Sequence, residues 1–173
     1  VGSGAGEEPR IILDHPHVFA LVKPPGWTVV VEHFEGLPGQ ATEDVGSTGR
    51  PLQGWLAERF GSEQPIMHDS QSQHGIVHRL DRDTSGVLLC AKTYAGYYAA
   101  QLCFAARRVI KGYVCLCHGR MAPGPLPRLL EAPLRTAGRI GAWRSVADAE
   151  NGKPACTEVC ATCHLVGPPA AAE

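Results

Sequence analysis

Apolar residues in this chain occur in short runs, and segments rich in glycine and proline lie between many of them. No run approaches the roughly 18 apolar residues that a membrane-spanning helix requires, so an integral membrane protein of that kind is not expected. Short runs separated by turn residues favour strands over long helices. With 20 glycines and 14 prolines among 173 residues, the pattern predicts an α+β fold. We expect a mixed, mostly antiparallel sheet with a few flanking helices.

The positions of the strands follow from the apolar runs and the turns between them. The KPPG sequence at 23–26 predicts a tight bend between two strands within residues 10–31. The nearly continuous apolar run at 86–92 predicts a strand that is buried on both faces. Alternation of side chains predicts a further strand at 111–118. The last two strands are expected at 138–146 and 155–166, as a hairpin around Asn151-Gly152.

Two segments have helical spacing of apolar residues. Residues 52–60 predict a short amphipathic helix that ends at Gly61. Thr93 is a candidate N-cap for a helix over 94–107. Its inner stripe is expected to be Tyr94, Tyr98, Leu102 and Ala105.

The remaining segments predict loops and ends. Residues 1–9 are expected to be a flexible leader, because no apolar run of a secretory signal follows them. Residues 35–51 are polar and rich in glycine and proline, which predicts a flexible loop. Residues 10–166 are expected to form the folded domain, and 167–173 a tail. The seven cysteines form an odd set without an export signal, which indicates reduced thiols and an intracellular protein.

The charge is neutral overall but uneven along the chain. The net charge is −1, whereas residues 101–144 carry eight arginines and lysines against Glu131. Such a basic segment can bind phosphate groups, or its arginines can simply face water. The charge pattern alone favours neither interpretation.

The densest cluster of chemically active side chains lies at residues 75–86. Arg79 and Arg82 flank Asp81 there, and Thr84-Ser85-Gly86 follows. Neighbouring arginines would lower the pKa of Asp81 and keep it ionised, and they could also bind phosphates. The alternative is an ordinary salt-bridged turn.

Residues 78–89 (HRLDRDTSGVLL), with Ala91-Lys92 after them, resemble the catalytic signature of RNA pseudouridine synthases of the RluA-like branch. Four further segments resemble elements of that family in the same order. They are 20–27 (ALVKPPGW), 108–113 (RVIKGY), 132–134 (APL) and 152–157 (GKPACT). The resemblance covers residues 10–166, and its implied fold is the α+β catalytic domain of that family.

The resemblance implies that a uridine in structured rRNA or tRNA is flipped out and isomerised to pseudouridine, without a cofactor or a metal. Asp81 is then the essential carboxylate, and Tyr113 is the tyrosine that stacks on the uracil and accepts a proton. Arg79 would contact the RNA and keep the base extruded. The other expected RNA-binding residues are Arg82, Arg107, Arg108 and Lys111.

One family motif is missing. No string similar to Thr-Gly-Arg-x-His-Gln-Ile-Arg occurs, although its first arginine would pair with the catalytic aspartate. The sequence is therefore interpreted as a catalytic domain that is incomplete at its C-terminus. We expect no turnover by the 173 residues alone and an unpaired sheet edge. The alternative is a catalytically inactive relative that binds RNA.

Two motifs in the sequence match other functions. Cys160-Ala161-Thr162-Cys163-His164 matches the attachment motif of c-type haem, and Cys115, Cys117 and His118 could ligate zinc with the later cysteines. The alternation expected at 111–118 and 157–166 would turn these ligands to opposite faces. The cysteines are therefore expected to be small buried hydrophobic residues.

Overall fold

The computed structural model describes residues 7–29, 50–138 and 144–165, and the chain divides into two compact units, Val1–Lys111 and Gly112–Glu173. The predicted leader is described only at residues 7–9, and the predicted loop 35–51 only at its last two residues. The predicted tail 167–173 lies outside the described residues.

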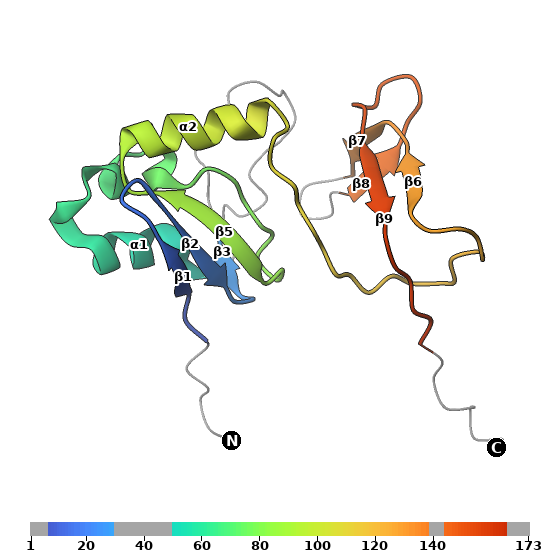
Figure 1. The fold of residues 1–173 in the computed structure, drawn as a ribbon, viewed down its shortest axis with the longest axis horizontal. Coiled ribbons are helices and arrows are strands. Elements are labelled where there is room, and N and C mark those ends of the chain that lie inside the picture. Colours follow the sequence, from blue (N-terminus) through green and yellow to red (C-terminus); the bar gives the residue numbers. More distant parts are fainter. Residues whose placement is uncertain (1–6, 30–49, 139–143, 166–173) are drawn as a thin grey trace, which may run out of the picture. The chain divides into compact units, whose positions relative to one another are not determined.

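A three-stranded antiparallel sheet of order β1-β2-β5 forms the centre of the first unit (Figure 1). β1 (Arg10–Asp14) turns back into β2 (Val18–Lys23), and β5 (Gly86–Ala91) pairs with β2 along its whole length. Phe19 and Leu21 of β2 lie opposite Cys90 and Leu88 of β5, and all four are fully buried. Period-two alternation therefore directs one face of this sheet into the core.

The predicted bend after β2 is present, but the strands on its two sides do not pair with each other. β3 (Trp27–Thr28) pairs in parallel with β4 (Arg50–Pro51), which leads directly into α1 (Leu52–Phe60). Gly61 ends α1 with a positive φ of 55°, as the sequence predicted. The short 3-10 helices that follow are Gly61–Glu63, Pro65–His68 and Gln73–Gly75.

The prediction that β5 is buried on both faces holds only toward its end, because Ala91 is fully buried but Val87, on the same face, is not. Leu88 and Cys90 are fully buried, whereas the side chain of Val87 is 53% exposed. An apolar run in a strand does not require two covered faces, because an antiparallel sheet can leave one face toward solvent.

α2 (Tyr94–Ala105) begins at the predicted N-cap, where the Thr93 hydroxyl accepts a hydrogen bond from the Gly96 amide at 3.1 Å. The predicted inner face was wrong. Tyr94, Tyr98 and Leu102 are exposed, whereas the buried residues of α2 are Gly96, Tyr97 and Ala100.

Gly96 explains the orientation of α2. A Cβ atom at this position would lie 2.2 Å from the carbonyl oxygen of His17, the residue before β2. The helix backbone therefore approaches the sheet where only glycine fits, and this contact turns the face of Gly96 inward.

This close approach predicts opposite effects for two Gly→Ala substitutions. Gly96→Ala is expected to lower the free energy of unfolding by about 1–3 kcal/mol, because the methyl group meets backbone. Gly54→Ala in α1 is the matched control, since its Cβ would meet only Pro51 Cγ at 3.9 Å. It is expected to gain up to about 1 kcal/mol from helix propensity. Urea denaturation measures both, and a stabilising Gly96→Ala would contradict the packing of α2.

The second unit contains two antiparallel strand pairs. β6 (Arg128–Glu131) pairs with β9 (Cys156–Val159), and β7 (Leu134–Ala137) pairs with β8 (Arg144–Ala147). The hairpin predicted between 138–146 and 155–166 was therefore wrong, although residues 139–143 and 166 lie outside the described part.

The turn at Asn151-Gly152 does form. The carboxylate of Asp148 accepts hydrogen bonds from the amides of Glu150 and Asn151, and with Arg135 these lower its pKa to about 2. Gly152 is required, because a Cβ there would lie 2.3 Å from the Asp148 carbonyl oxygen. After the turn, Lys153 forms an antiparallel bridge with Leu134 of β7, the strand that also pairs with β8.

Residues 111–118 do not form the predicted strand. The structure assigns them no helix or strand, and the side chains of Tyr113, Val114 and Leu116 are exposed. In the described part of the chain no strand pairs with them. The α+β class and the mostly antiparallel pairing are nevertheless confirmed, with the described strands divided among four small sheets. Among the described residues, no helix is long and apolar enough to cross a membrane.

Candidate active site

Asp81 lies at the first position of a tight turn that leads into β5. The amide of Thr84 donates to the carbonyl oxygen of Asp81 at 3.1 Å and closes the turn. Leu80 is buried, whereas its neighbours Arg79 and Asp81 are exposed. The buried leucine anchors the turn, and the carboxylate and the guanidinium on its two sides face outward.

The buried side chain of Lys23 hydrogen-bonds to the backbone of this turn. Its side chain is fully buried at the end of β2, on the same face as Phe19 and Leu21. The ammonium donates to the carbonyl oxygens of Pro24 at 3.1 Å, Trp27 at 3.0 Å and Arg82 at 2.9 Å. A buried cation needs such a set of acceptors, because it has left water. Lys23 thereby ties the KPPG bend to the turn that carries Asp81.

Gly26 makes the second connection between the bend and the turn. Its amide donates to the same Arg82 carbonyl oxygen at 2.9 Å, and its φ is +83°, which glycine adopts without strain. The Arg82 carbonyl therefore accepts two hydrogen bonds from the KPPG segment.

Arg82 binds the carboxylate of the next residue, Asp83. Its guanidinium binds Asp83 with two hydrogen bonds of 2.9 Å, Nε to Oδ1 and Nη2 to Oδ2. This bidentate pair, with a weaker contribution from Lys23, lowers the pKa of Asp83.

His78 lies on the other side of Leu80. Its Nε2 accepts a hydrogen bond from the Leu89 amide of β5 at 3.0 Å, and its ring packs on Phe104 of α2 with centroids 4.9 Å apart. Burial lowers the pKa of His78, the nearby Lys111 ammonium lowers it further, and hydrogen bonding to the Arg79 backbone opposes both.

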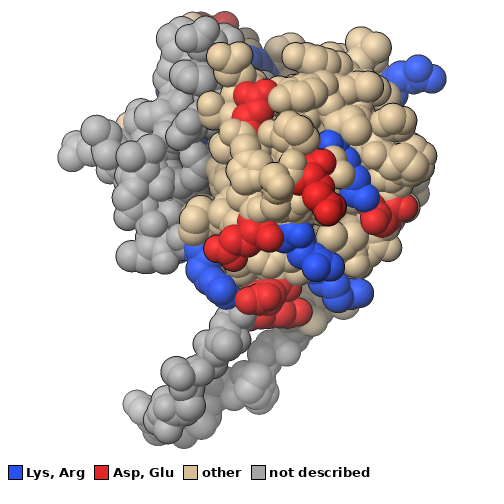
Figure 2. Space-filling model, turned by 90° about the vertical axis from the view of Figure 1, so that its left-hand side faces the viewer, with Lys and Arg blue, Asp and Glu red and all other residues tan. Residues whose placement is uncertain are grey.

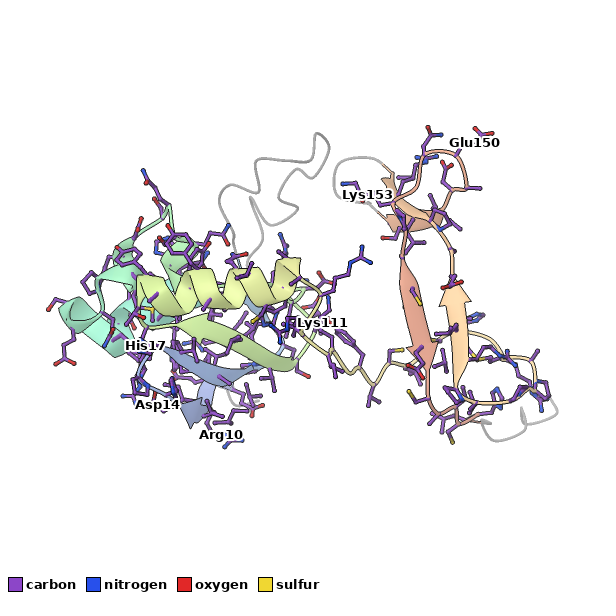
Figure 3. All side chains as sticks on the ribbon, turned by 45° about the horizontal axis from the view of Figure 1, so that its top comes forward. Arg10, Asp14, His17, Lys111, Glu150 and Lys153 are labelled. Carbon is purple, nitrogen blue, oxygen red and sulfur yellow. The ribbon has the colours of Figure 1, made fainter. Side chains whose placement is uncertain are left out.

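The first residues of the basic segment follow α2. The amide of Arg107 donates to Phe104 at 3.0 Å and that of Arg108 to Cys103 at 2.9 Å, which is the Schellman pattern of a helix end. Arg107 has a φ of +55°, in the position that glycine usually takes. Both arginines and Lys111 are exposed, and Lys111 lies just beyond the helix (Figure 3). On the face drawn in Figure 2, by contrast, basic and acidic side chains alternate.

The predicted site residues fall into both units. Asp81, Arg79, Arg82, Arg107, Arg108 and Lys111 belong to the first unit. Tyr113 belongs to the second unit, and its side chain is exposed.

The cysteines differ from the prediction that they are buried. Only Cys90 is buried among them, and burial raises its pKa to about 12. The other six are exposed, with the sulfur atoms of Cys115 and Cys117 3.6 Å apart. Within the described residues, no three His, Cys, Asp or Glu side chains are grouped to hold a metal ion.

The structural role of Lys23 was not predicted from the sequence. A signal was present, because Lys23 continues the period-two series of Phe19 and Leu21 on the buried face of β2. A lysine at a position where alternation predicts a core side chain indicates a buried cation with backbone acceptors.

The sequence was also compared with known proteins. The family model described as RNA pseudouridylate synthase matches residues 17–163. "Ribosomal large subunit pseudouridine synthase D" of Buchnera aphidicola subsp. Schizaphis graminum is 40% identical over 113 residues, which are 65% of this chain and 30% of that protein. "RNA pseudouridine synthase 1" of Arabidopsis thaliana is 32% identical over 92 residues, which are 53% of this chain and 28% of that protein.

A solved structure is also similar. "Human RNA Pseudouridylate Synthase Domain Containing 4" matches with a TM-score of 0.48 and 19% identity, covering 86% of this chain and 51% of that one. The matched region spans between 16% and 36% of the length of the curated relatives. The family model covers most of the residues, including the Asp81 turn, the KPPG bend and Tyr113. The chain therefore belongs to the RNA pseudouridylate synthase family.

Proposed function

We propose that this protein is an RNA pseudouridine synthase and that residues 10–166 belong to its catalytic domain. The observation that carries the proposal is the Asp81 turn, in which an exposed carboxylate stands on a backbone that Lys23 and Gly26 hold from the core. A catalytic carboxylate must reach the substrate and must also be fixed in position, and this turn meets both requirements.

The reaction exchanges one bond to the ribose for another. The N1–C1′ glycosidic bond of uridine breaks, the uracil rotates, and C5 bonds to C1′. The proton on C5 is lost and N1 takes up a proton, so the product is an isomer of the substrate. In this proposal Asp81 is the essential carboxylate, acting as nucleophile or general base. Tyr113 stacks on the uracil and accepts a proton, and Arg79 contacts the RNA and keeps the base extruded.

We infer that the substrate is a structured RNA inside the cell, rRNA or tRNA. Several relatives are named ribosomal large subunit pseudouridine synthases, so rRNA of the large subunit is the first substrate to test. No cofactor or metal takes part in the proposed reaction.

Release of tritium from RNA labelled at C5 of uridine tests the proposal directly, because this hydrogen leaves when C5 bonds to the ribose. We expect tritium release from large-subunit rRNA incubated with the intact protein. RNA binding without release would favour the alternative, a catalytically inactive relative that binds RNA.

The basic segment after α2 gives a second prediction. Arg107→Ala with Arg108→Ala is expected to weaken RNA binding and to flatten its salt dependence, because each lost phosphate contact lowers the slope of log K against log[salt] by about 0.7–0.9. Arg59→Ala is the control, since it removes an exposed arginine from α1. Titrations at several salt concentrations measure the slopes. Equal slopes for the wild type and the double variant would mean that these arginines do not contact phosphate.

A further inference from the structure

One edge of β5 pairs with a full strand, whereas its other edge contacts a single bridge residue and a histidine side chain. β2 pairs with β5 over residues Gly86 to Ala91, whereas on the other side Ile76 forms a single bridge with Cys90. Next to this bridge, the Leu89 amide donates to the imidazole of His78 at 3.0 Å. In a larger sheet, a carbonyl oxygen of the next strand would accept the hydrogen bond of the Leu89 amide. Here Nε2 of His78 accepts it.

This contact defines the protonation of His78. A backbone amide can only donate, so Nε2 must carry a lone pair and the ring proton must be on Nδ1. The ring faces Phe104 of α2 on one side and the Leu89 amide of β5 on another, and the charged side chain that acts on it is the Lys111 ammonium. The Leu89 amide, the Lys111 ammonium and the burial of the ring disfavour an added proton. Hydrogen bonding to the Arg79 backbone acts in the opposite direction.

His78 also lies close to Asp81 along the chain. Two residues separate it from Asp81, and one of them is the buried Leu80. On the far side of Asp81, Lys23 and Gly26 hold the carbonyl of Arg82. On the N-terminal side of Asp81, the His78 contact fixes the turn to β5. On the C-terminal side, the bonds to the Arg82 carbonyl fix it to the KPPG bend.

We propose that neutral His78 is a positioning residue that fixes the start of the Asp81 turn to β5, and that proton uptake by His78 releases the turn and lowers turnover. The turnover part rests on the proposed function, whereas the contact itself does not.

The direction of the pH effect follows from the lowered pKa of His78. The folded state binds a proton less readily than the unfolded state, so the stabilisation from this contact is fully present above the ordinary histidine value of about 6.5. It is lost as the pH falls from there through the lower pKa of the folded state.

Three variants separate the contributions of His78. His78→Gln places an amide oxygen near the position of Nε2 and does not titrate. His78→Phe keeps an aromatic ring on Phe104 but has no acceptor. His68→Gln is the control, because this exposed histidine bonds elsewhere, to the Gly61 carbonyl oxygen at 2.9 Å.

Nitrogen-15 NMR of the full chain tests the contact without any assay of turnover. We expect Nδ1 of His78 to be protonated and Nε2 not, and the Leu89 amide to exchange slowly in the wild type, the Gln variant and the control. The protection factor of the Leu89 amide, which is the exchange rate of an unstructured amide at the same pH divided by its own exchange rate, should fall in the Phe variant at every pH. In the wild type it should fall as the pH drops below about 6.5. A protonated Nε2 at neutral pH, or unchanged exchange in the Phe variant, would overturn the proposal.

The pH profile of kcat tests positioning in the intact protein. We expect the acid limb of the wild type to be absent in His78→Gln, and kcat of His78→Phe to fall about tenfold to a hundredfold with a smaller change in KM. An acid limb that persists in the Gln variant would overturn the positioning role. If the wild type shows no turnover at any pH, the proposed function fails, and the NMR results still decide whether the contact exists.

Discussion

Replacing Asp81 by Asn is expected to abolish pseudouridine formation by the intact protein. The substitution keeps the size of the side chain but removes the charge and the basicity that a nucleophile or a general base requires. Removal of such a group lowers kcat by about 10⁴-fold or more. Tritium release from C5-labelled RNA measures the loss.

The fold and the RNA affinity should survive this change. Asp81 is exposed, and the turn is closed by its backbone carbonyl and not by its carboxylate. Asp83→Asn is the matched control, because it neutralises the other carboxylate of the same turn, the one bound by Arg82. We expect the control to retain most of its turnover. Activity near that of the wild type in Asp81→Asn would exclude Asp81 as the essential carboxylate.

Lys23→Met is expected to produce the largest loss of stability among these variants. The methionine fills a similar volume but removes three hydrogen bonds from a buried cation and leaves two carbonyl oxygens, those of Pro24 and Trp27, without the ammonium. Each buried acceptor that loses its partner costs about 1–3 kcal/mol. We expect a loss of about 2–4 kcal/mol on this basis, against the total of about 5–15 kcal/mol that is typical of domains.

Lys92→Met provides the comparison for Lys23. The Lys92 side chain is 14% exposed and forms an ion pair with Asp14, whose side chain is 61% exposed. The same substitution there should cost less than at Lys23, because the carboxylate that loses its partner remains in water. Urea denaturation of both variants gives the difference. Equal and small losses would mean that the ammonium of Lys23 does not hold the turn.

Features that depend on a few neighbouring residues could be predicted from the sequence. Thr93 caps α2 and Gly61 ends α1, because a cap requires only the residue itself and the adjacent backbone. The exposed position of Asp81 beside a buried leucine follows in the same way from a polar turn before an apolar strand.

Features that depend on residues far apart in the sequence could not be predicted from it. Both faces of α2 carry apolar residues, and the approach of His17 to Gly96 decides which one is buried. Residues 111–118 alternate like a strand, but a strand exists only where another strand pairs with it. The Asn151-Gly152 sequence predicts a turn from adjacent residues alone. It does not indicate that β8 pairs with β7, the strand before it in the chain. The contact between Lys23 and Arg82 joins residues 59 positions apart.

The attachment of the turn through the Arg82 carbonyl has a consequence for how this family can diversify. Lys23 and Gly26 bind a main-chain oxygen, which every amino acid carries. The side chains at positions 82 and 83 can therefore change in evolution, or in the laboratory, while these two bonds remain. A library randomised at Arg82 and Asp83 could alter which RNA is selected without moving the carboxylate beside them.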